Sequence, residues 1–268
     1  MCKDVFVAND RGDIRAYGNP YAAVQSLEAN AYRDVRPGYP NEALQWALAQ
    51  LHKAGSESQY LKVADIGAGT GKLTAQLVAL GYDTWAVEPA AQMRTQFTQA
   101  LPDFPPDHLL ATSGEATGLP DRSCAAVVYG QSWHWLDAPA ASAEAARILR
   151  SGGVLAVLVN QLAVDHPWVH RLTRIMRSGD VAKLSNSPQL GVAFSDPESF
   201  SCEWSAGATP EEIIALGATR ASWLRASAGQ RVKMRANLEW YLYEHLGFTP
   251  GALVQLPYRT YAWRAYLR

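Results

Sequence analysis

The sequence predicts an α/β fold built on a doubly wound, mostly parallel sheet. Between residues 61 and 160, short apolar runs alternate with amphipathic helical patterns, which is the arrangement that parallel strands and their crossover helices require. A glycine-rich turn follows the first apolar run, and the second run ends on Glu88. After Asn160 the alternation gives way to helical patterns, and the chain closes with a further apolar and aromatic run. The sequence therefore predicts one sheet with a helical region appended to it.

The first elements follow from apolar spacing and from helix-breaking residues. Prolines and a glycine within 37–40 exclude a helix there, and Asn41 is suited to cap the helix at 42–53. The run 63–66 predicts a buried strand, and leucines at helical spacing over 71–80, closed by Gly81, predict the next helix. The remaining elements up to Asn160 are predicted as strands at 83–87, 109–113, 125–129 and 154–159, and helices at 90–101 and 139–150.

The second half of the chain is predicted to be mainly helical. Helical patterns cover 166–177, 211–226 and 230–246, and the strands 199–204 and 256–266 complete the sheet. We predict the following organisation: an N-terminal arm and lid at 1–40, a cofactor-binding core at 41–160, a helical cap and substrate region with the sixth strand at 161–250, and the final strand at 251–268.

Composition excludes several classes of function. The 268 residues are 48% hydrophobic and 18% charged, with a formal net charge of −1, so no broad basic surface favours nucleic acid or an anionic membrane. The three cysteines are far apart, which indicates neither a disulfide framework nor a metal cluster. The N-terminus lacks the apolar core of a signal peptide, and no run is long enough for a membrane helix. We therefore expect a cytoplasmic protein, monomeric or homodimeric, without a metal.

The turn after the first strand indicates a nucleoside cofactor. Residues 65–71 are Asp-Ile-Gly-Ala-Gly-Thr-Gly, and glycines let the backbone approach a ligand that a Cβ would hold off. A dinucleotide fingerprint Gly-x-Gly-x-x-Gly would need glycine at position 72 or 74, where Lys72 and Thr74 stand. An acid at the end of the second strand, Glu88, is suited to bind ribose hydroxyls.

These motifs resemble motif I of the class I S-adenosylmethionine-dependent methyltransferases. From about residue 31 to the C-terminus, the chain is similar to the small-molecule group that includes trans-aconitate methyltransferases and quinone-biosynthesis C-methyltransferases. The resemblance implies a seven-stranded Rossmann-like sheet with an antiparallel C-terminal strand, and S-adenosylmethionine as cofactor. The segments that carry it are 36–40, 65–72, 87–89, 114–120, 133–135, 149–153 and 257–260.

The resemblance also implies roles for individual residues. The loop 67–71 would hold the methionine part of the cofactor, Glu88 the ribose, and Glu115 with Ala116 the adenine. Gln131 and Trp133 would approach the sulfonium, where an aromatic face is attractive to a cation. Thr117 stands where related proteins often have Glu, so that role does not transfer. The predicted cofactor-binding residues are Tyr32, Arg36, Asp65, Gly67, Ala68, Gly69, Gly71, Glu88, Pro89, Met93, Glu115, Ala116, Gln131 and Trp133.

Some of these residues have structural alternatives. Tyr32 and Arg36 would close over the cofactor as a lid, with Arg36 pairing with its carboxylate, or would form a structural turn beside a helix. His134 is the candidate general base because an ordinary histidine pKa suits proton abstraction at neutral pH, yet it could equally be a packing residue. The predicted substrate-binding residues are Trp133, His134, Trp135 and Arg220.

The favoured function is methyl transfer from S-adenosylmethionine to a small organic acceptor: a carboxylate, a hydroxyl or a carbon acid. The alternatives are a non-catalytic sensor that binds S-adenosylmethionine or S-adenosylhomocysteine and a partner, and a nicotinamide-dependent reductase, which the misplaced third glycine disfavours. Nucleic acid is a less favoured acceptor because residues 129–132, Tyr-Gly-Gln-Ser, lack the Asn-Pro-Pro-Tyr type of motif.

Overall fold

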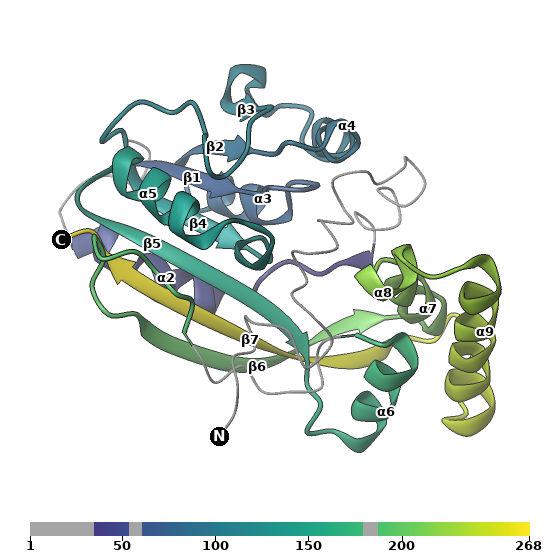
Figure 1. The fold of residues 1–268 in the computed structure, drawn as a ribbon. Helices are drawn as coiled ribbons and strands as arrows, with labels where there is room; N and C mark the ends of the chain where they lie inside the picture. Colours follow the sequence, from purple (N-terminus) through teal and green to yellow (C-terminus); the bar gives the residue numbers. More distant parts are fainter. Residues whose placement is uncertain (1–34, 54–60, 179–186) are drawn as a thin grey trace.

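The computed structural model describes residues 35–53, 61–178 and 187–268 and contains a seven-stranded sheet (Figure 1). Its strand order is β3-β2-β1-β4-β5-β7-β6. Strands β1 to β5 pair in parallel, and β7 is antiparallel to both of its neighbours, β5 and β6. The predicted fold class is thereby confirmed, including the antiparallel C-terminal strand. The strands are β1 (Lys62–Ile66), β2 (Asp83–Val87), β3 (Leu109–Leu110), β4 (Cys124–Gly130), β5 (Leu149–Leu162), β6 (Glu198–Ala208) and β7 (Val254–Tyr266).

Helices lie on both faces of this sheet and beyond one of its ends (Figure 1). Helices connect β1 to β2, β2 to β3 and β4 to β5, as expected for crossovers between parallel strands. The α-helices of the described ranges are α2 (Asn41–Lys53), α3 (Lys72–Ala79), α4 (Ala91–Ala100), α5 (Ala138–Ile148), α6 (Pro167–Met176), α7 (Pro210–Ala218), α8 (Ala221–Leu224) and α9 (Ala228–Glu239). The short 3₁₀ segments are η4 (Pro106–His108) and η5 (Trp133–Trp135), and η6 (Trp240–His245) is a π-helix that continues α9.

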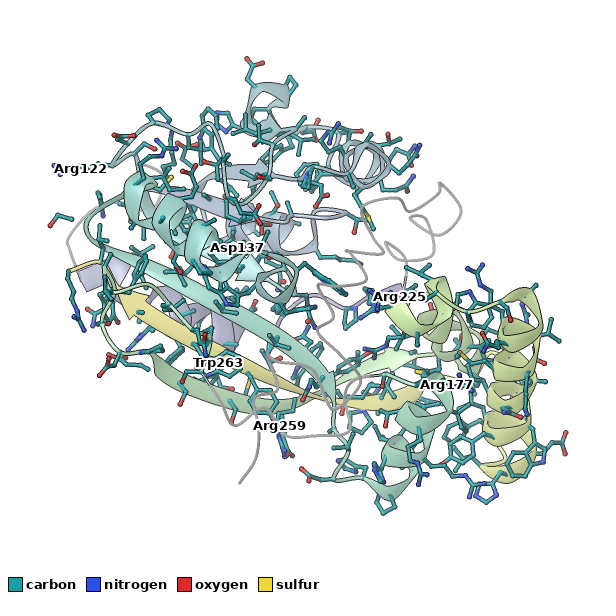
Figure 2. The ribbon with its side chains drawn as sticks, in the orientation of Figure 1. Arg122, Asp137, Arg177, Arg225, Arg259 and Trp263 are labelled. Atoms are coloured by element: carbon teal, nitrogen blue, oxygen red, sulfur yellow. The ribbon has the colours of Figure 1, made fainter. Side chains whose placement is uncertain are left out.

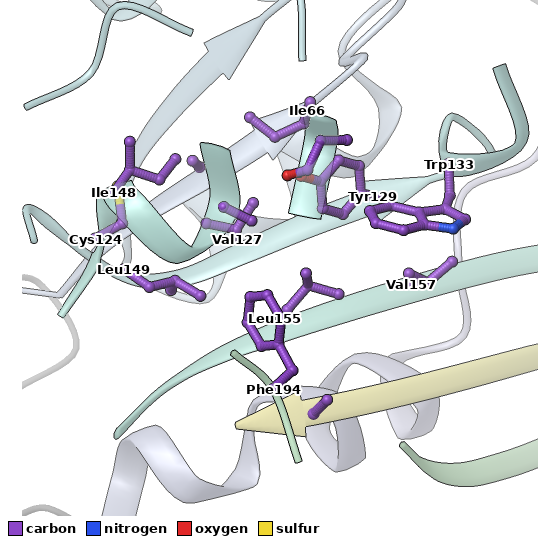
Figure 3. Packing of buried hydrophobic residues seen from close by; sticks show 14 of the residues in the cluster. Ile66, Cys124, Val127, Tyr129, Trp133, Ile148, Leu149, Leu155, Val157 and Phe194 are labelled. Atoms are coloured by element: carbon purple, nitrogen blue, oxygen red, sulfur yellow. The ribbon is translucent and has the colours of Figure 1, made fainter. Parts of the chain in front are cut away.

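Alternation along the central strands divides the core between the two faces of the sheet. In β4, Val127 and Tyr129 pack beneath α5, whereas Ala126 and Val128 face α2 and α3. Figure 3 shows the first of these clusters, in which the Tyr129 and Trp133 rings lie edge to face with centroids 4.8 Å apart. Because both faces are covered, β4 is an almost continuous apolar run, as expected for a buried parallel strand.

A third hydrophobic cluster joins α6, α7 and α9 to the C-terminal end of β5 and the N-terminal end of β7. It includes Leu172, Ile213 and Leu238, which are fully buried, together with Leu162 and Tyr258 from the sheet. These helices gather beyond the end of the sheet where β5 terminates (Figure 1). The sheet therefore carries a helical cap at the side where the parallel strands have their carboxyl ends.

The structure corrects three predicted elements. The strand predicted at 109–113 is limited to β3, because Ser113 turns back to bridge Ala116. The helix predicted at 211–226 is two helices, because Arg220 is extended (ψ 147°) and the Thr219 carbonyl accepts a hydrogen bond from the Arg36 guanidinium. The helix predicted at 230–246 ends as the π-helix η6.

Candidate functional site

A cleft lies at the carboxyl ends of β1, β4 and β5. Crevices at this edge are where open α/β sheets bind their ligands. The cleft is walled by the glycine loop after β1, the ends of β4 and β5, a segment before α2, and single residues of the cap and β7. The lining residues are Arg36, Pro37, Tyr39, Asp65, Gly67, Ala68, Gly69, Thr70, Lys72, Leu73, Gly130, Gln131, Asn160, Arg220 and Tyr258.

The three glycines of the loop are required for two different reasons, close packing and space for a ligand. All three have positive φ (72°, 58° and 86° for Gly67, Gly69 and Gly71), a backbone conformation that residues other than glycine adopt only with strain. A Cβ at Gly67 would lie 2.5 Å from the Ser132 Cβ, and one at Gly71 would lie 2.9 Å from Phe97. A Cβ at Gly69 would meet nothing within 4 Å, so this glycine borders open space. Gly67 and Gly71 are needed for packing, whereas Gly69 leaves room for a ligand.

Asp65, the last but one residue of β1, is the buried acid of the cleft. It is 1% exposed, and its Oδ2 accepts a hydrogen bond of 2.6 Å from the Thr74 hydroxyl. Its Oδ1 is buried and has no hydrogen-bond partner among the described residues. Burial is the main cause that raises the pKa of Asp65 to about 7, and the nearby Glu88 carboxylate adds to the effect. A ligand in the cleft could therefore supply the hydrogen-bond donor or the cation that Oδ1 of this carboxyl lacks among the described residues.

Glu88 closes the far side of the glycine loop, at the end of β2. Its Oε2 accepts from the Gly69 amide at 2.9 Å and its Oε1 accepts from the Ala90 amide at 2.8 Å. Burial raises the pKa of Glu88, although these two hydrogen bonds oppose the effect. A carboxylate has about four acceptor positions, so each oxygen keeps the capacity to accept from one more donor, such as a hydroxyl. Pro89 is exposed, and Met93 is buried one turn into α4.

The turn after β3 is held against α5. The Glu115 carboxylate accepts from the Asp137 amide at 3.0 Å, and the Ala116 amide donates to the Ser113 carbonyl. Thr117 donates both its amide and its hydroxyl to Glu144 Oε1, at 2.7 and 2.6 Å. The predicted adenine-contacting residues are therefore on a turn of fixed geometry, although neither Glu115 nor Ala116 lines the cleft.

Beyond β4, the chain divides its side chains between the cleft and the core. Gln131 has φ 59° and lines the cleft, where its Nε2 donates to the Asn160 carbonyl at 2.6 Å. The Trp133 ring turns the other way: it is 3% exposed and packs on Tyr129 (Figure 3). The structure thus places Trp133 in the core and not on the cleft surface, because the η5 turn directs its side chain towards α5.

His134 is a weak base in this environment. Burial is the main cause that lowers its pKa to about 4, and the Arg36 guanidinium adds to the effect. The imidazole is therefore neutral at pH 7 but accepts a proton poorly. Its ring contacts that of Trp135, over which the Arg225 guanidinium lies at 6.0 Å. Arg225 lies beside α8 and Asp137 beside α5 (Figure 2), so the cap and the core meet at this turn.

The segment before α2 is tied to three different elements. Arg36 donates to the Thr219 hydroxyl and carbonyl, at 2.9 and 3.1 Å. The Gly38 carbonyl accepts from Asn160 Nδ2 at 2.8 Å. Tyr39 exchanges two backbone hydrogen bonds with the Gln76 side chain, at 2.8 and 2.6 Å. In the structure this segment forms one wall of the cleft.

Seven of the residues predicted from the sequence meet at the cleft: Arg36, Asp65, Gly67, Ala68, Gly69, Gln131 and Arg220. Tyr32 lies outside the described residues. Lining residues to which no role was assigned from the sequence include Lys72, Asn160 and Tyr258, of which Lys72 and Tyr258 lie in segments that carry the family resemblance. A usable signal existed for Asn160, which follows the apolar run of β5 and so stands at the carboxyl end of a strand. Tyr258 lies in the segment 257–260 that carries the family resemblance, but this strand is distant in sequence and the resemblance gave it no role at the cleft.

Two negative findings apply to the described ranges alone. No cluster of three or more histidine, cysteine or acidic side chains in them is suited to hold a metal ion. No helix in them combines the length and the apolar character needed to cross a membrane.

Comparison with known proteins identifies the fold and the cofactor class. Residues 64–157 match the methyltransferase domain family. A methyltransferase of Mycobacterium tuberculosis whose reaction is uncharacterised is 35% identical over 240 residues, which cover 88% of this chain and 93% of the relative. Another, from Schizosaccharomyces pombe, is 26% identical over 214 residues, covering 78% and 82% of the two chains.

Solved structures share the fold at low sequence identity. One, assigned as a methyltransferase of an antibiotic biosynthesis pathway in Anabaena variabilis, superposes with a TM-score of 0.52 at 18% identity, covering 82% of this chain and 96% of its own. One from Anaeromyxobacter dehalogenans, assigned as a type II methyltransferase, has a TM-score of 0.51 at 20% identity, covering 87% and 97%.

Proposed function

Because the chain belongs to the class I S-adenosylmethionine-dependent methyltransferases, we propose that it methylates a small organic acceptor that carries an acidic group. S-adenosylmethionine is the cofactor, and when bound it supplies an activated methyl group on a sulfonium. The residues of the cleft fit it on two observations: the open space at Gly69 and the buried, unpartnered Oδ1 of Asp65.

The charges around the cleft support the assignment of different residues to different groups of the cofactor. Asp65 is suited to accept the ammonium group of the cofactor, which would favour the ionised form of its carboxyl. Arg36 would pair with the cofactor carboxylate, and Glu88 would accept from the ribose hydroxyls with the acceptor positions that remain to it. Glu115 and Ala116, on the turn after β3, would contact the adenine.

The observation that carries the acidic acceptor is the basic lining of the cleft. Arg36, Lys72 and Arg220 all line it, and Asp65 is the acid among the described lining residues. The cofactor carboxylate and the acceptor would therefore both meet a lining that is richer in cationic than in acidic side chains. Arg220 and Tyr258 lie on the cap side and would bind the acceptor there.

His134 does not support a reaction that requires a strong base. A pKa of about 4 leaves the imidazole with little capacity to abstract a proton from a phenol or a carbon acid. Methyl transfer to an acceptor that is already an anion needs no proton removal, and alignment of the nucleophile with the methyl group supplies much of the rate. We therefore place a carboxylate ahead of a hydroxyl or a carbon acid as the methylated group. We also propose that the protein acts in the cytoplasm on small-molecule metabolites.

The test is a screen for production of S-adenosylhomocysteine with matched pairs of small molecules, each acid beside its neutral amide. We expect turnover of one or more acids and none of their amides. Arg220→Gln should raise KM for the acid, whereas Arg235→Gln, which removes an exposed cation paired with Glu239, should not. Turnover confined to neutral acceptors would contradict the acidic acceptor. Tight cofactor binding without turnover of any acceptor would favour the non-catalytic sensor.

A further inference from the structure

A chain of hydrogen bonds, buried at its centre and partly buried at its two ends, leads from β6 to the wall of the cleft. The Trp204 indole Nε1 donates to the Thr260 hydroxyl at 2.8 Å, and this hydroxyl donates to Asn160 Oδ1 at 2.6 Å. Asn160 Nδ2 then donates to the Gly38 carbonyl at 2.8 Å. Thr260 is fully buried and Asn160 is 8% exposed, so water does not compete for the hydrogen bond between these two side chains.

The chemistry of its two ends fixes the direction of this chain. An indole N–H can only donate, so the Thr260 oxygen must accept from Trp204 and its proton is available for Asn160. The Asn160 amide is therefore held with its oxygen towards Thr260 and its NH₂ towards the cleft. A backbone carbonyl can only accept, so the Gly38 carbonyl is a suitable acceptor for the Asn160 NH₂ at the other end of the chain. The opposite amide orientation would set an oxygen against the Gly38 carbonyl.

The amide at the end of this chain is also a support for both sides of the cleft. The Asn160 backbone carbonyl accepts from Gln131, which lines the side formed by β4. Its side chain holds Gly38, which lies between Arg36 and Tyr39 on the opposite wall. The position of Asn160 thus bears on the distance between Arg36 and the glycine loop.

We propose that Trp204 and Thr260 are positioning residues that act through Asn160 to hold Arg36 at the methionine end of the cofactor. The inference rests on the proposed role of Arg36 in pairing with the cofactor carboxylate. Neither Trp204 nor Thr260 lines the cleft, so their effect on a ligand is transmitted through the amide and the Gly38 carbonyl.

The test compares two ligands that differ at the methionine end alone. S-adenosylhomocysteine carries the amino-acid carboxylate, and 5′-methylthioadenosine lacks it. Calorimetric titration should show that Thr260→Val weakens the affinity for S-adenosylhomocysteine about tenfold, the equivalent of one buried hydrogen bond, and that for 5′-methylthioadenosine less than about twofold. Thr260→Ser keeps the hydroxyl and should restore the wild-type affinity. Trp204→Phe should give a loss of about threefold with the same ligand preference, because Thr260 keeps its proton but loses the donor that orients it.

A control variant separates this role from general stability. Tyr129→Phe removes a buried hydroxyl that donates to the Ala141 carbonyl beneath α5, away from the cleft, and should leave both affinities unchanged. Equal losses for the two ligands, or unchanged S-adenosylhomocysteine binding in both Thr260→Val and Trp204→Phe, would overturn the proposal. If Thr260→Val does not fold, the ligand preference of Trp204→Phe decides.

Failure of the inference can be told apart from failure of the proposed function. Unchanged S-adenosylhomocysteine binding by Arg36→Ala would contradict the carboxylate role of Arg36. A loss in Arg36→Ala without a loss in Thr260→Val would contradict the hydrogen-bond chain alone. If both are correct, the double variant should lose less affinity than the sum of the single losses, because the two residues serve one contact.

Discussion

Replacement of Asp65 by asparagine should stabilise the protein at neutral and alkaline pH while weakening its affinity for S-adenosylmethionine. The carboxyl has an ordinary pKa of 3.8, and burial raises it to about 7 in the fold. Since the folded pKa is the higher one, the unfolded chain releases this proton first, and stability falls as the pH rises from about 4 to about 7. Above that range the accumulated cost is about 4 kcal/mol, from about three pKa units at 1.36 kcal/mol each.

Asparagine removes this charge and keeps an oxygen that can accept from the Thr74 hydroxyl. Its NH₂ would replace the buried Oδ1 that has no partner among the described residues, at a cost of about 1 to 3 kcal/mol. The net gain at pH 8 is therefore about 1 to 3 kcal/mol, or a rise in Tm of about 5 °C for a chain of this size. Because the buried acid is gone, the gain in Tm of Asp65→Asn over the wild type should grow as the pH rises from about 4 to about 7.

The assay is thermal unfolding from pH 5 to 8.5, paired with calorimetric titration of S-adenosylhomocysteine at the two ends of that range. Relative to Asp65→Asn, which shares the opposing contribution of His134, the wild type should lose stability with rising pH. The wild type should also gain affinity with rising pH, because the ionised carboxylate attracts the ligand ammonium, whereas Asp65→Asn should not. A variant that is less stable than the wild type at pH 8, or that keeps the same pH dependence, would refute the assignment of the cost to this carboxyl.

Three further predictions follow from the site. Gly69→Ala should fold, because its Cβ meets open space, but calorimetry should show at least about tenfold weaker binding of S-adenosylhomocysteine. Gly71→Ala should lose about 1 to 3 kcal/mol of unfolding free energy in chemical denaturation, because its Cβ approaches Phe97. The reverse pattern would contradict the separate roles of the two glycines. Glu88→Gln should weaken binding of S-adenosylhomocysteine by about tenfold or more, since a neutral amide is a poorer acceptor than a carboxylate, and a competition assay that finds equal affinity would exclude it from the site. The kcat of His134→Asn should stay within about threefold of the wild type, with no titration near pH 6.5 in either profile; a loss of about a hundredfold or more would restore His134 as the general base.

Local patterns predicted the elements of the sheet and the position of the glycine loop. The apolar runs of β1, β2 and β4 and the spacing of leucines in α3 indicate each element by itself, because both faces of the sheet are covered. The acids at the ends of β1 and β2 were recognisable because parallel strands share one functional edge. These features were predictable because each depends on residues that are near one another in the sequence.

The remaining features depend on contacts between distant residues. The break between α7 and α8 follows from Arg36, which lies 183 positions before the Thr219 it binds. Trp133 was predicted to face the sulfonium, but the η5 turn directs its ring onto Tyr129. The low pKa of His134 arises from burial and from Arg36, neither of which its neighbours in sequence reveal. Whether Met93, Pro89, Glu115 and Ala116 touch the cofactor stays a prediction.

The most direct test of the cofactor site is calorimetric titration of the purified protein with S-adenosylhomocysteine, S-adenosylmethionine and NADH, alongside Gly69→Val. We expect micromolar binding of the first two ligands, no binding of NADH, and loss of binding in Gly69→Val, which should still unfold cooperatively. Normal affinity in Gly69→Val, or binding of NADH alone, would contradict a cofactor site at this cleft.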